Sequence, residues 1–233
     1  GNGYRMYGIQ DVVTLNIIRS LRDVELPTEE IRGYLERRTV GDTMTLLERE
    51  EAALGERVQA LEAARLEVRR RRARLERYAQ VETGRTVFLR EAERPCVFLR
   101  EDIILEGEID FLLKKLESRH QDYIKVIGDQ CMGAVLDGES LTRGVYNHYS
   151  RVFFLTRPGL PYDGSLPGGE YARLYYRGSY DRLEEHWHAL RTAIAAAGRR
   201  PGGAPLELYR VDAHDTNREE EYVTELQVQV LPA

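Results

Sequence analysis

The stretch DTMTLLEREEAALGERVQALEAARLEVRRRRARLERY, residues 42–78, decides the fold and contains no Pro. A large aliphatic residue stands at every seventh position in it, at Leu47, Leu54, Leu61, Val68 and Leu75. This repeat is typical of a coiled coil, because it keeps an apolar seam on one side of a helix. A helix of this length would extend about 55 Å, which is too long to lie on a domain of this chain's size. We therefore expect residues 42–78 to form a helix that pairs with the same helix of a second copy in a homodimer.

The four arginines at residues 69–72 allow two interpretations. A basic run can bind nucleic acid, but Glu67 and Glu76 lie beside this one. Mixed charge on a long helix is more typical of a solvated face, and that interpretation is favoured.

The residues before the long helix predict a small hairpin and two short helices. Asn2-Gly3 favours the positive φ angles of a tight turn, and the alternating aromatic residues after it predict the second strand of a hairpin whose first strand lies upstream. Apolar residues at helical spacing follow from Asp11 onward. The sequence Pro27-Thr28-Glu29-Glu30 is typical of the start of a second helix. We expect residues 1–40 to be part of a small domain that begins before Gly1.

After residue 82 the pattern changes to alternating strands and helices. The predicted strands are residues 86–89, 96–100, 132–136, 152–156, 171–176, 206–211 and 222–231, and the predicted helices are residues 108–127 and 180–197. This order predicts an α+β domain over residues 82–233, in which a strand-helix-strand-strand unit is duplicated. Both helices are expected on one face of a shared antiparallel sheet, which leaves the other face for a ligand cleft.

Composition excludes several classes of protein. The chain has 233 residues, 42% of them hydrophobic, which suits a folded chain with one or two cores. Its apolar runs are far shorter than the roughly 20 residues of a membrane span, and no signal-peptide pattern is present, so a cytoplasmic location is expected. Cys96 and Cys131 stand singly in apolar contexts and are predicted to be buried, reduced thiols. Residues 82–233 carry 19 basic and 25 acidic residues, which argues against nucleic-acid binding by this part.

Residues 3–38 resemble the MerR family of transcription regulators. The resemblance is carried by Gly3-Tyr4-Arg5-Met6-Tyr7, by the helix after it, by Leu26-Pro27-Thr28-Glu29-Glu30-Ile31, and by the long helix that follows. It implies the remnant of a winged helix-turn-helix, an antiparallel coiled coil over residues 41–81, and binding to promoter DNA and RNA polymerase. The recognition helix of the family would lie upstream of Gly1, so this chain alone is expected to bind DNA weakly.

The resemblance also implies which residues contact DNA. Tyr4, Arg5 and Tyr7 would be wing residues near phosphates, and Arg19 is a further candidate. A guanidinium suits this role, because it can contact two phosphate oxygens at once. For Tyr7, packing of the hairpin against the helix behind it is an equal alternative.

The C-terminal half resembles the GyrI-like effector-binding domain. Three segments carry this: Tyr176-Arg177-Gly178-Ser179-Tyr180 before a helix that contains Trp187, then Leu206-Glu207-Leu208-Tyr209, then the closing strand with Thr224-Glu225. The resemblance implies a ligand cleft that contains Glu225. In multidrug-sensing members a carboxylate among aromatic rings holds lipophilic cations.

The chemistry of these residue types agrees with that role. A poorly hydrated carboxylate attracts a cation, and each Tyr face adds about 0.5 to 2 kcal/mol. Strand alternation places Glu225 on the opposite face from Leu226 and Val228, and therefore towards the expected cleft. The candidate ligand-binding residues are Glu225, Tyr149, Tyr171, Tyr175, Tyr209 and Trp187. Packing is an equal alternative for each Tyr, and it is favoured for Trp187, which lies in the apolar stripe of a helix.

These features predict an effector-responsive transcription regulator, most simply an activator, that binds a small lipophilic organic compound and remodels promoter DNA as a dimer. Two alternatives remain open: a GyrI-like hydrolase that uses Glu225 as a base, and a protein that sequesters a drug or a protein target. No nucleophile, base and orienter set is visible in the sequence. His186 and His188 are two residues apart on a helix and point in different directions, so no metal site and no cofactor are expected.

Overall fold

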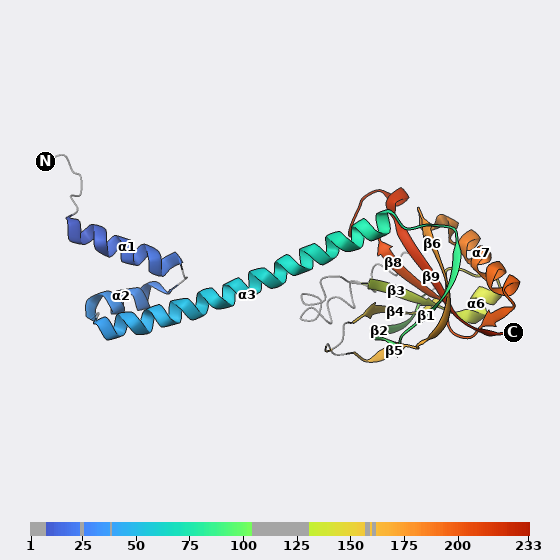
Figure 1. Ribbon diagram of the computed structural model, residues 1–233, viewed down its shortest axis with the longest axis horizontal. Coiled ribbons are helices and arrows are strands. Elements are labelled where there is room, and N and C mark those ends of the chain that lie inside the picture. The colour runs from blue at the N-terminus through green and yellow to red at the C-terminus, as the bar shows by residue number, and fades with distance from the viewer. Residues whose placement is uncertain (1–7, 24–25, 38, 104–130, 157–158, 160–161) are drawn as a thin grey trace. The chain divides into compact units, whose positions relative to one another are not determined.

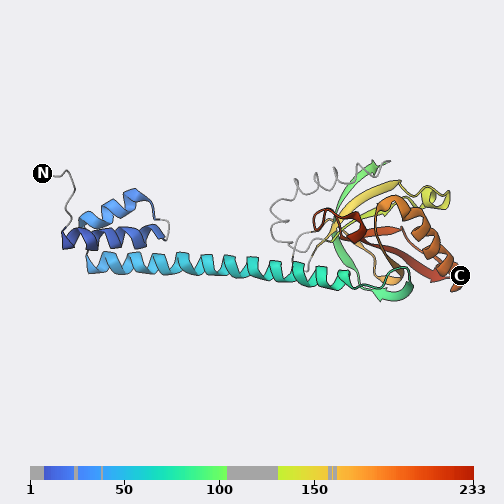
Figure 2. The ribbon, with the colours of Figure 1, turned by 90° about the horizontal axis from the view of Figure 1, so that it is seen from above.

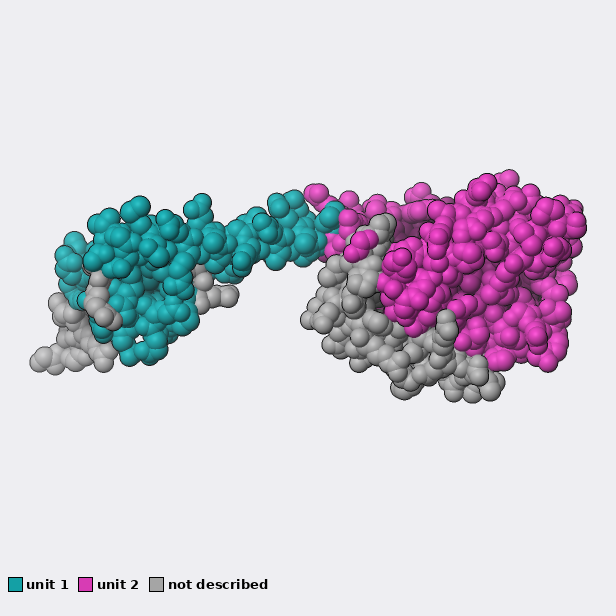
Figure 3. Space-filling model, turned by 90° about the horizontal axis from the view of Figure 1, so that it is seen from below, with its two compact units in different colours: residues 1–66 teal, residues 67–233 magenta. Residues whose placement is uncertain are grey.

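The computed structural model describes residues 8–23, 26–37, 39–103, 131–156, 159 and 162–233. Two compact units, Gly1–Leu66 and Glu67–Ala233, are coloured teal and magenta in Figure 3. The boundary between them falls inside one helix. The strand predicted at residues 4–7 and the helix predicted at residues 108–127 lie outside the described residues.

The first unit is built from helices (Figure 2). It contains α1 (Ile9–Asp23), α2 (Thr28–Arg37) and the first part of α3 (Val40–Ala79). The start of α3 is fixed by a reciprocal cap: Asp42 N donates to Thr39 Oγ1 over 3.1 Å, and Thr39 N donates to Asp42 Oδ2 over 3.0 Å. A small core of Leu21, Ile31 and Leu46 joins the three helices. The helices predicted from Asp11, from Pro27 and over residues 42–78 are confirmed.

The heptad positions of α3 lie in two environments. Leu47, Leu54, Leu61 and Val68 are 56%, 47%, 70% and 69% exposed, so no described part of this single chain covers the stripe. The fifth position, Leu75, differs, because it packs with Tyr78 into the second unit. The end of α3 therefore belongs to the core of the second unit, while the rest of its seam faces outward.

The second unit is formed by one antiparallel sheet with helices (Figure 1). The path of neighbouring strands is β1-β6-β9-β8-β3-β4-β2-β5, and β7 pairs with β9. The strands are β1 (Thr86–Glu91), β2 (Arg94–Ile103), β3 (Cys131–Leu136), β4 (Tyr149–Leu155), β5 (Gly164–Leu166), β6 (Gly169–Arg177), β7 (Arg199–Pro201), β8 (Leu206–Val211) and β9 (Val223–Pro232). The helices are α6 (Gly138–Thr142) and α7 (Leu183–Ala196), with short 3₁₀ turns η1 (Tyr180–Arg182) and η2 (Glu219–Glu221). All seven predicted strands are present, whereas α6, β5 and β7 were not predicted.

The sheet is strongly curled. Three strands, β8, β3 and β4, separate β9 from β2 along the path of pairing. Nevertheless Arg94 of β2 donates to Gln227 of β9 over 2.8 Å, from Nη1 to Oε1. The face on which these two side chains meet is therefore the inside of the curl, and we call it the inner face.

Helix α7 covers the other face, which we call the outer face. Its buried residues Leu183, Trp187, Leu190 and Ile194 follow the helical repeat. They pack with residues that alternate along the strands, among them Ala134, Leu174, Leu226 and Val228. The predicted alternation of β9, with Leu226 and Val228 on one face and Glu225 on the other, is confirmed.

Among the described residues, side chains occupy part of the inner face, where an open cleft was expected. A second apolar cluster occupies part of it, formed by Cys96, Val135, Phe153, Leu166, Tyr171, Leu206 and Leu208. Burial raises the pKa of the Cys96 thiol to about 11, and both cysteines are free thiols, as predicted. Among the described residues, a cavity of about 50 Å³ lies on this face beside Tyr171 and Gln229, and a cavity of that size is too small for an organic effector. Curling brings side chains from distant strands together on this face, as Arg94 and Gln227 show.

Candidate functional site

A buried carboxylate held by aromatic donors lies on the outer face. Glu207 is 1% exposed. Trp187 Nε1 donates to its Oε1 over 3.1 Å, while the hydroxyl groups of Tyr149 and Tyr209 donate to its Oε2 over 3.3 and 3.2 Å. Each of these groups is a donor to an oxygen acceptor, which is the arrangement that suits an ionised carboxylate.

Local structure explains how these side chains meet. Along β8 alternate side chains point to the same face, so Glu207 and Tyr209 share the outer face while Leu206 and Leu208 share the inner one. Trp187 descends from the middle of the apolar stripe of α7. Tyr149 begins β4, whose neighbour β3 lies directly beside β8. The carboxylate is thus fixed by one helix and two strands.

Aromatic rings lead outward from this carboxylate. The ring of Tyr180 in η1 lies edge-on to Tyr209, with centroids 5.8 Å apart, and it lies 5.8 Å from the ring of Tyr222. Burial raises the pKa of both Tyr209 and Tyr180, so these hydroxyls remain protonated donors. Tyr180 is only partly buried. These packed rings therefore form a continuous row from the partly buried Tyr222 and Tyr180 to Tyr209, which contacts Glu207.

Glu225 lies on the inner face and has arginine partners. Its side chain is 1% exposed, and its Oε2 lies 2.6 Å from both Nε and Nη2 of Arg210. Arg173 Nε lies 3.7 Å from Oε1, and Gln227 donates to the same oxygen. Arg210 also stacks over the ring of Tyr78, 5.4 Å from its centroid. The charge of Glu225 is therefore balanced within the protein.

The six candidate ligand residues do not form one site, which corrects the expectation from sequence. Tyr149, Tyr209 and Trp187 surround Glu207 on the outer face. Glu225, Tyr171 and Tyr175 lie on the inner face. In the sheet Glu225 of β9 pairs with Tyr175 of β6 on one side and with Leu208 of β8 on the other. Glu207, the neighbour of Leu208, therefore points to the outer face. This pairing register is what separates the two groups.

The two inner-face tyrosines have packing roles. The hydroxyl of Tyr171 donates to the carbonyl of Pro167 over 2.7 Å, and the guanidinium of Arg94 stacks on its ring at 5.1 Å. Tyr175 packs against Tyr78 with centroids 5.9 Å apart, and burial raises the pKa of Tyr175 above its usual value. Both side chains therefore stabilise the packing of the inner face.

Glu207 is the residue that sequence reasoning missed. It was considered only as part of the segment Leu206-Glu207-Leu208-Tyr209, although an acidic residue between Leu206 and Leu208 in a strand is a signal for a buried charge. The resemblance drew attention to Glu225 instead.

Of the candidate DNA contacts, only Arg19 lies within the described residues. It is exposed on α1, as contact with phosphates requires. Tyr4, Arg5 and Tyr7 lie outside the described residues.

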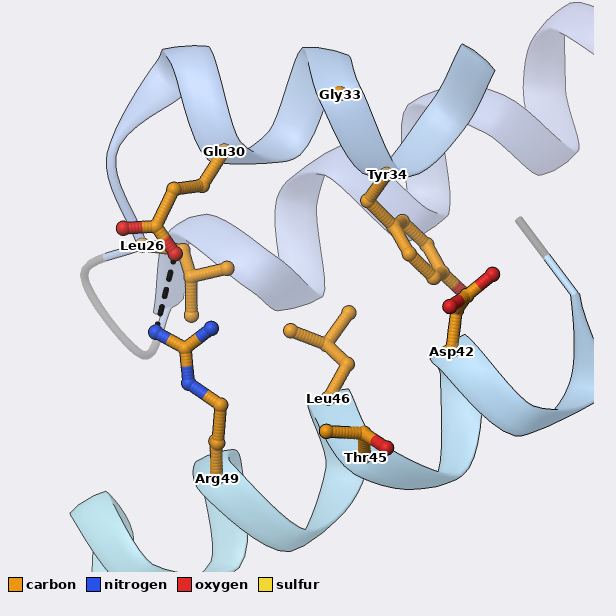
Figure 4. A pocket seen from close by; sticks show the side chains of 8 residues that line it. All are labelled: Leu26, Glu30, Gly33, Tyr34, Asp42, Thr45, Leu46 and Arg49. Atoms are coloured by element: carbon orange, nitrogen blue, oxygen red, sulfur yellow. Dashed lines mark hydrogen bonds and ion pairs between the residues drawn. The ribbon is translucent and has the colours of Figure 1, made fainter. Parts of the chain in front are cut away.

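A groove of about 490 Å³ opens in the first unit (Figure 4). It is lined by Leu26, Glu30, Gly33, Tyr34, Asp42, Thr45, Leu46 and Arg49. Its two long charged side chains, Glu30 and Arg49, pair with each other over 3.1 Å and are 46% and 62% exposed. An exposed pair of this kind contributes little energy and discriminates poorly between ligands. The candidate effector site is placed at Glu207 instead, because three aromatic donors converge there on one buried carboxylate.

Within the described ranges there is no group of three or more His, Cys, Asp or Glu residues placed to hold a metal ion. Nor does that part of the chain contain a helix long and apolar enough to cross a membrane.

The curled antiparallel sheet belongs to a class of small-molecule binding domains. The GyrI-like small molecule binding domain matches residues 90–231. The chain belongs to this family. No curated protein matches the chain in sequence.

Solved structures share the fold at low sequence identity. The EcmrR chain in the cryo-EM structure of the EcmrR-DNA complex in EcmrR-RPo is 16% identical with a TM-score of 0.52, and the match covers 100% of this chain and 87% of that one. The crystal structure of the EcmrR C-terminal domain gives the same identity and TM-score over 64% of this chain and 98% of that one. A hydrolase encoded by lin2189 from Listeria innocua is 10% identical with a TM-score of 0.50, covering 67% and 96%. These likenesses establish the fold, and the first extends it over the helical unit.

Proposed function

We propose that this chain is a dimerising MerR-type transcription regulator that responds to a small lipophilic cation bound at Glu207. The observation that carries the effector site is the buried carboxylate of Glu207 under Trp187, Tyr149 and Tyr209. The proposal for gene regulation is supported by the helical unit and α3, which have the fold of a regulator solved on DNA.

A cation is the effector class that this site favours. A carboxylate in a poorly hydrated setting gains most from an opposite charge, and the surrounding ring faces attract the same cation. Rings also accept many ligand shapes. The effector would reach Glu207 along Tyr222, Tyr180 and Tyr209, and it would displace the hydroxyl of Tyr209 from the carboxylate.

The apolar seam of α3 supports a homodimer. Leu47, Leu54, Leu61 and Val68 are exposed in the single chain, and burial of such side chains in a coiled coil contributes about 1.5 to 3 kcal/mol each. A dimer on promoter DNA, with RNA polymerase as the further partner, then follows from the MerR resemblance.

Calorimetric titration with tetraphenylphosphonium tests the effector site. Glu207→Gln keeps the shape and removes the charge, so affinity for this cation should fall about 10- to 100-fold, or roughly 1.4 to 2.8 kcal/mol. Triphenylphosphine oxide, a neutral analogue, should bind wild type and variant alike.

Glu225→Gln is the matched control, because it makes the same change on the inner face. It should bind the cation within twofold of wild type. Equal affinity of Glu207→Gln and wild type for the cation, with both proteins folded, would exclude Glu207 as the anchor. Consumption of a reactive probe would instead favour the hydrolase alternative.

A further inference from the structure

The end of α3 is held to β8, and to the segment that follows it, by a cluster of charged side chains around the buried Asp215. Asp215 lies in the segment between β8 and β9, and its side chain is only 4% exposed. Arg74 of α3 binds it in a fork, with Nη1 to Oδ2 and Nη2 to Oδ1 both at 3.0 Å. Arg71, one turn earlier in α3, donates from Nη2 to Oδ1 over 2.9 Å. Two-point contacts of this kind fix direction as well as distance.

The same arginines also bind backbone carbonyls. Arg71 Nη2 donates to the carbonyl of His214 over 2.7 Å, and Arg74 Nη1 donates to the carbonyl of Arg210. Arg210 stands at an irregularity of β8, since the register with β9 shifts between Tyr209 and Val211. A bulge turns a carbonyl out of the regular ladder, and here α3 binds it.

This bulge is next to the proposed effector site. Tyr209, which donates to Glu207, directly precedes Arg210 in the chain. The side chain of Arg210 is fixed on the inner face by Glu225. If release of the Tyr209 hydroxyl moves β8, the movement therefore reaches Arg210, and Arg74 of α3 binds the carbonyl of Arg210.

We propose that Asp215, with Arg71 and Arg74, forms a clamp that couples the effector site on β8 to the dimerisation helix α3. This inference rests on the proposed function. A cation at Glu207 replaces the Tyr209 hydroxyl, the strand adjusts at the bulge of Arg210, and the clamp passes this adjustment to the last turns of α3. Asp215 and the two arginines are positioning residues, since they do not touch the effector site.

Coupling of this kind needs an element with two arrangements that the ligand biases. In this proposal the bulge is that element, because the ladder of β8 with β9 is already locally disrupted there. The clamp transmits this change to α3, because its donors are charged guanidinium groups and its central carboxylate is excluded from water. Hydrogen bonds of this kind are strong.

Hydrogen-deuterium exchange of the full chain, with and without saturating tetraphenylphosphonium, tests the proposal. In wild type the cation should change the exchange rates of residues 70–79 at least threefold. In Asp215→Asn the cation should bind within twofold of wild type, while the change over residues 70–79 falls to less than a quarter. Glu76→Gln is the matched control, because Glu76 pairs with Arg72 on the same stretch of α3 but is 66% exposed; it should keep the full response.

Each result has a separate meaning. Cation binding in wild type without any response in residues 70–79 would overturn the clamp and leave the proposed function standing. A full response in Asp215→Asn would also overturn it. Absence of cation binding in wild type would overturn both proposals. If Asp215→Asn does not fold, Arg71→Gln takes its place, since Arg71 is 50% exposed; its response should be at least halved, and an unchanged response would overturn the clamp.

Discussion

Trp187 donates its indole N–H to Glu207 over 3.1 Å, which joins α7 to β8 at the buried carboxylate. Trp187 is the single tryptophan of the chain, and its side chain is fully buried. The intrinsic indole fluorescence of this protein therefore arises from one residue in direct contact with the proposed effector anchor.

Tryptophan emission should report effector binding. A cation at Glu207 changes the hydrogen bond and the local field of the indole, so titration with tetraphenylphosphonium should shift or quench the emission of wild type in a saturable way. The midpoint should agree with the calorimetric dissociation constant. Glu207→Gln should lose most of this change at the same concentrations, whereas Glu225→Gln should keep it. A saturable signal of equal size in all three proteins would place the binding site away from Glu207.

The dimer prediction concerns the exposed seam of α3. Replacing Leu54 and Leu61 by Asp puts charges into the expected coiled-coil core, so sedimentation should show monomers. Ala63→Asp is the matched control, because Ala63 is exposed two positions after Leu61 and off the seam; it should leave the dimer intact. A dimer mass that survives the double replacement would mean that another surface joins the copies.

Much of this fold is readable from the sequence. The heptads predict α3, and the period-two patterns predict the strands, with β8 matching residue for residue. These features are local, because they depend on which side chains a segment must bury. The short elements α6, β5 and β7 were missed, since three to five residues carry too little pattern.

Which residues lie together in the site was harder to predict, because this depends on the register in which the strands pair. The sequence shows that Glu207 and Tyr209 share one face of β8 and that Tyr171 and Tyr175 share one face of β6. Whether these two pairs lie on the same face of the sheet or on opposite faces follows only from the pairing of β8 and β6 with β9. The partner of Glu225 was equally hidden, since the contact with Arg210 depends on how β8 pairs with β9.

His186 should make stability depend on pH. Its ring stacks on Tyr176 with centroids 4.4 Å apart, and burial and then the positive charge of Arg182 lower its pKa from the usual 6.5. The unfolded chain therefore binds this proton more readily than the folded one. Stability is fully present above about pH 6.5 and is lost as pH falls through the lowered pKa.

Chemical unfolding at a series of pH values between 7.5 and 5 checks this prediction. In His186→Phe, which keeps a ring against Tyr176, the free energy of unfolding should fall less steeply with pH than in wild type. His188→Phe is the control, because it removes an exposed imidazole of the same helix, and its slope should match wild type. Identical slopes in wild type and His186→Phe would show that other groups set the acid sensitivity.

The last prediction concerns Glu225 and its pair with Arg210. In Glu225→Gln the guanidinium of Arg210 loses a charge-balancing partner in a setting where its own side chain is 16% exposed. Removal of one member of a buried pair is costly, because the other charge remains without hydration. We expect the free energy of unfolding to fall by about 2 to 4 kcal/mol, measured by urea unfolding.

Replacing both members together distinguishes the loss of the ion pair from the cost of leaving one buried charge without its partner. Arg210→Met with Glu225→Leu removes both charges and keeps apolar volume, so this double variant should recover more than half of the stability lost in Glu225→Gln. Its affinity for tetraphenylphosphonium should stay close to that of wild type, because the outer face is unchanged. If Glu225→Gln instead keeps full stability and binds the cation at least tenfold more weakly, then Glu225 and not Glu207 is the anionic anchor, and the effector site belongs on the inner face.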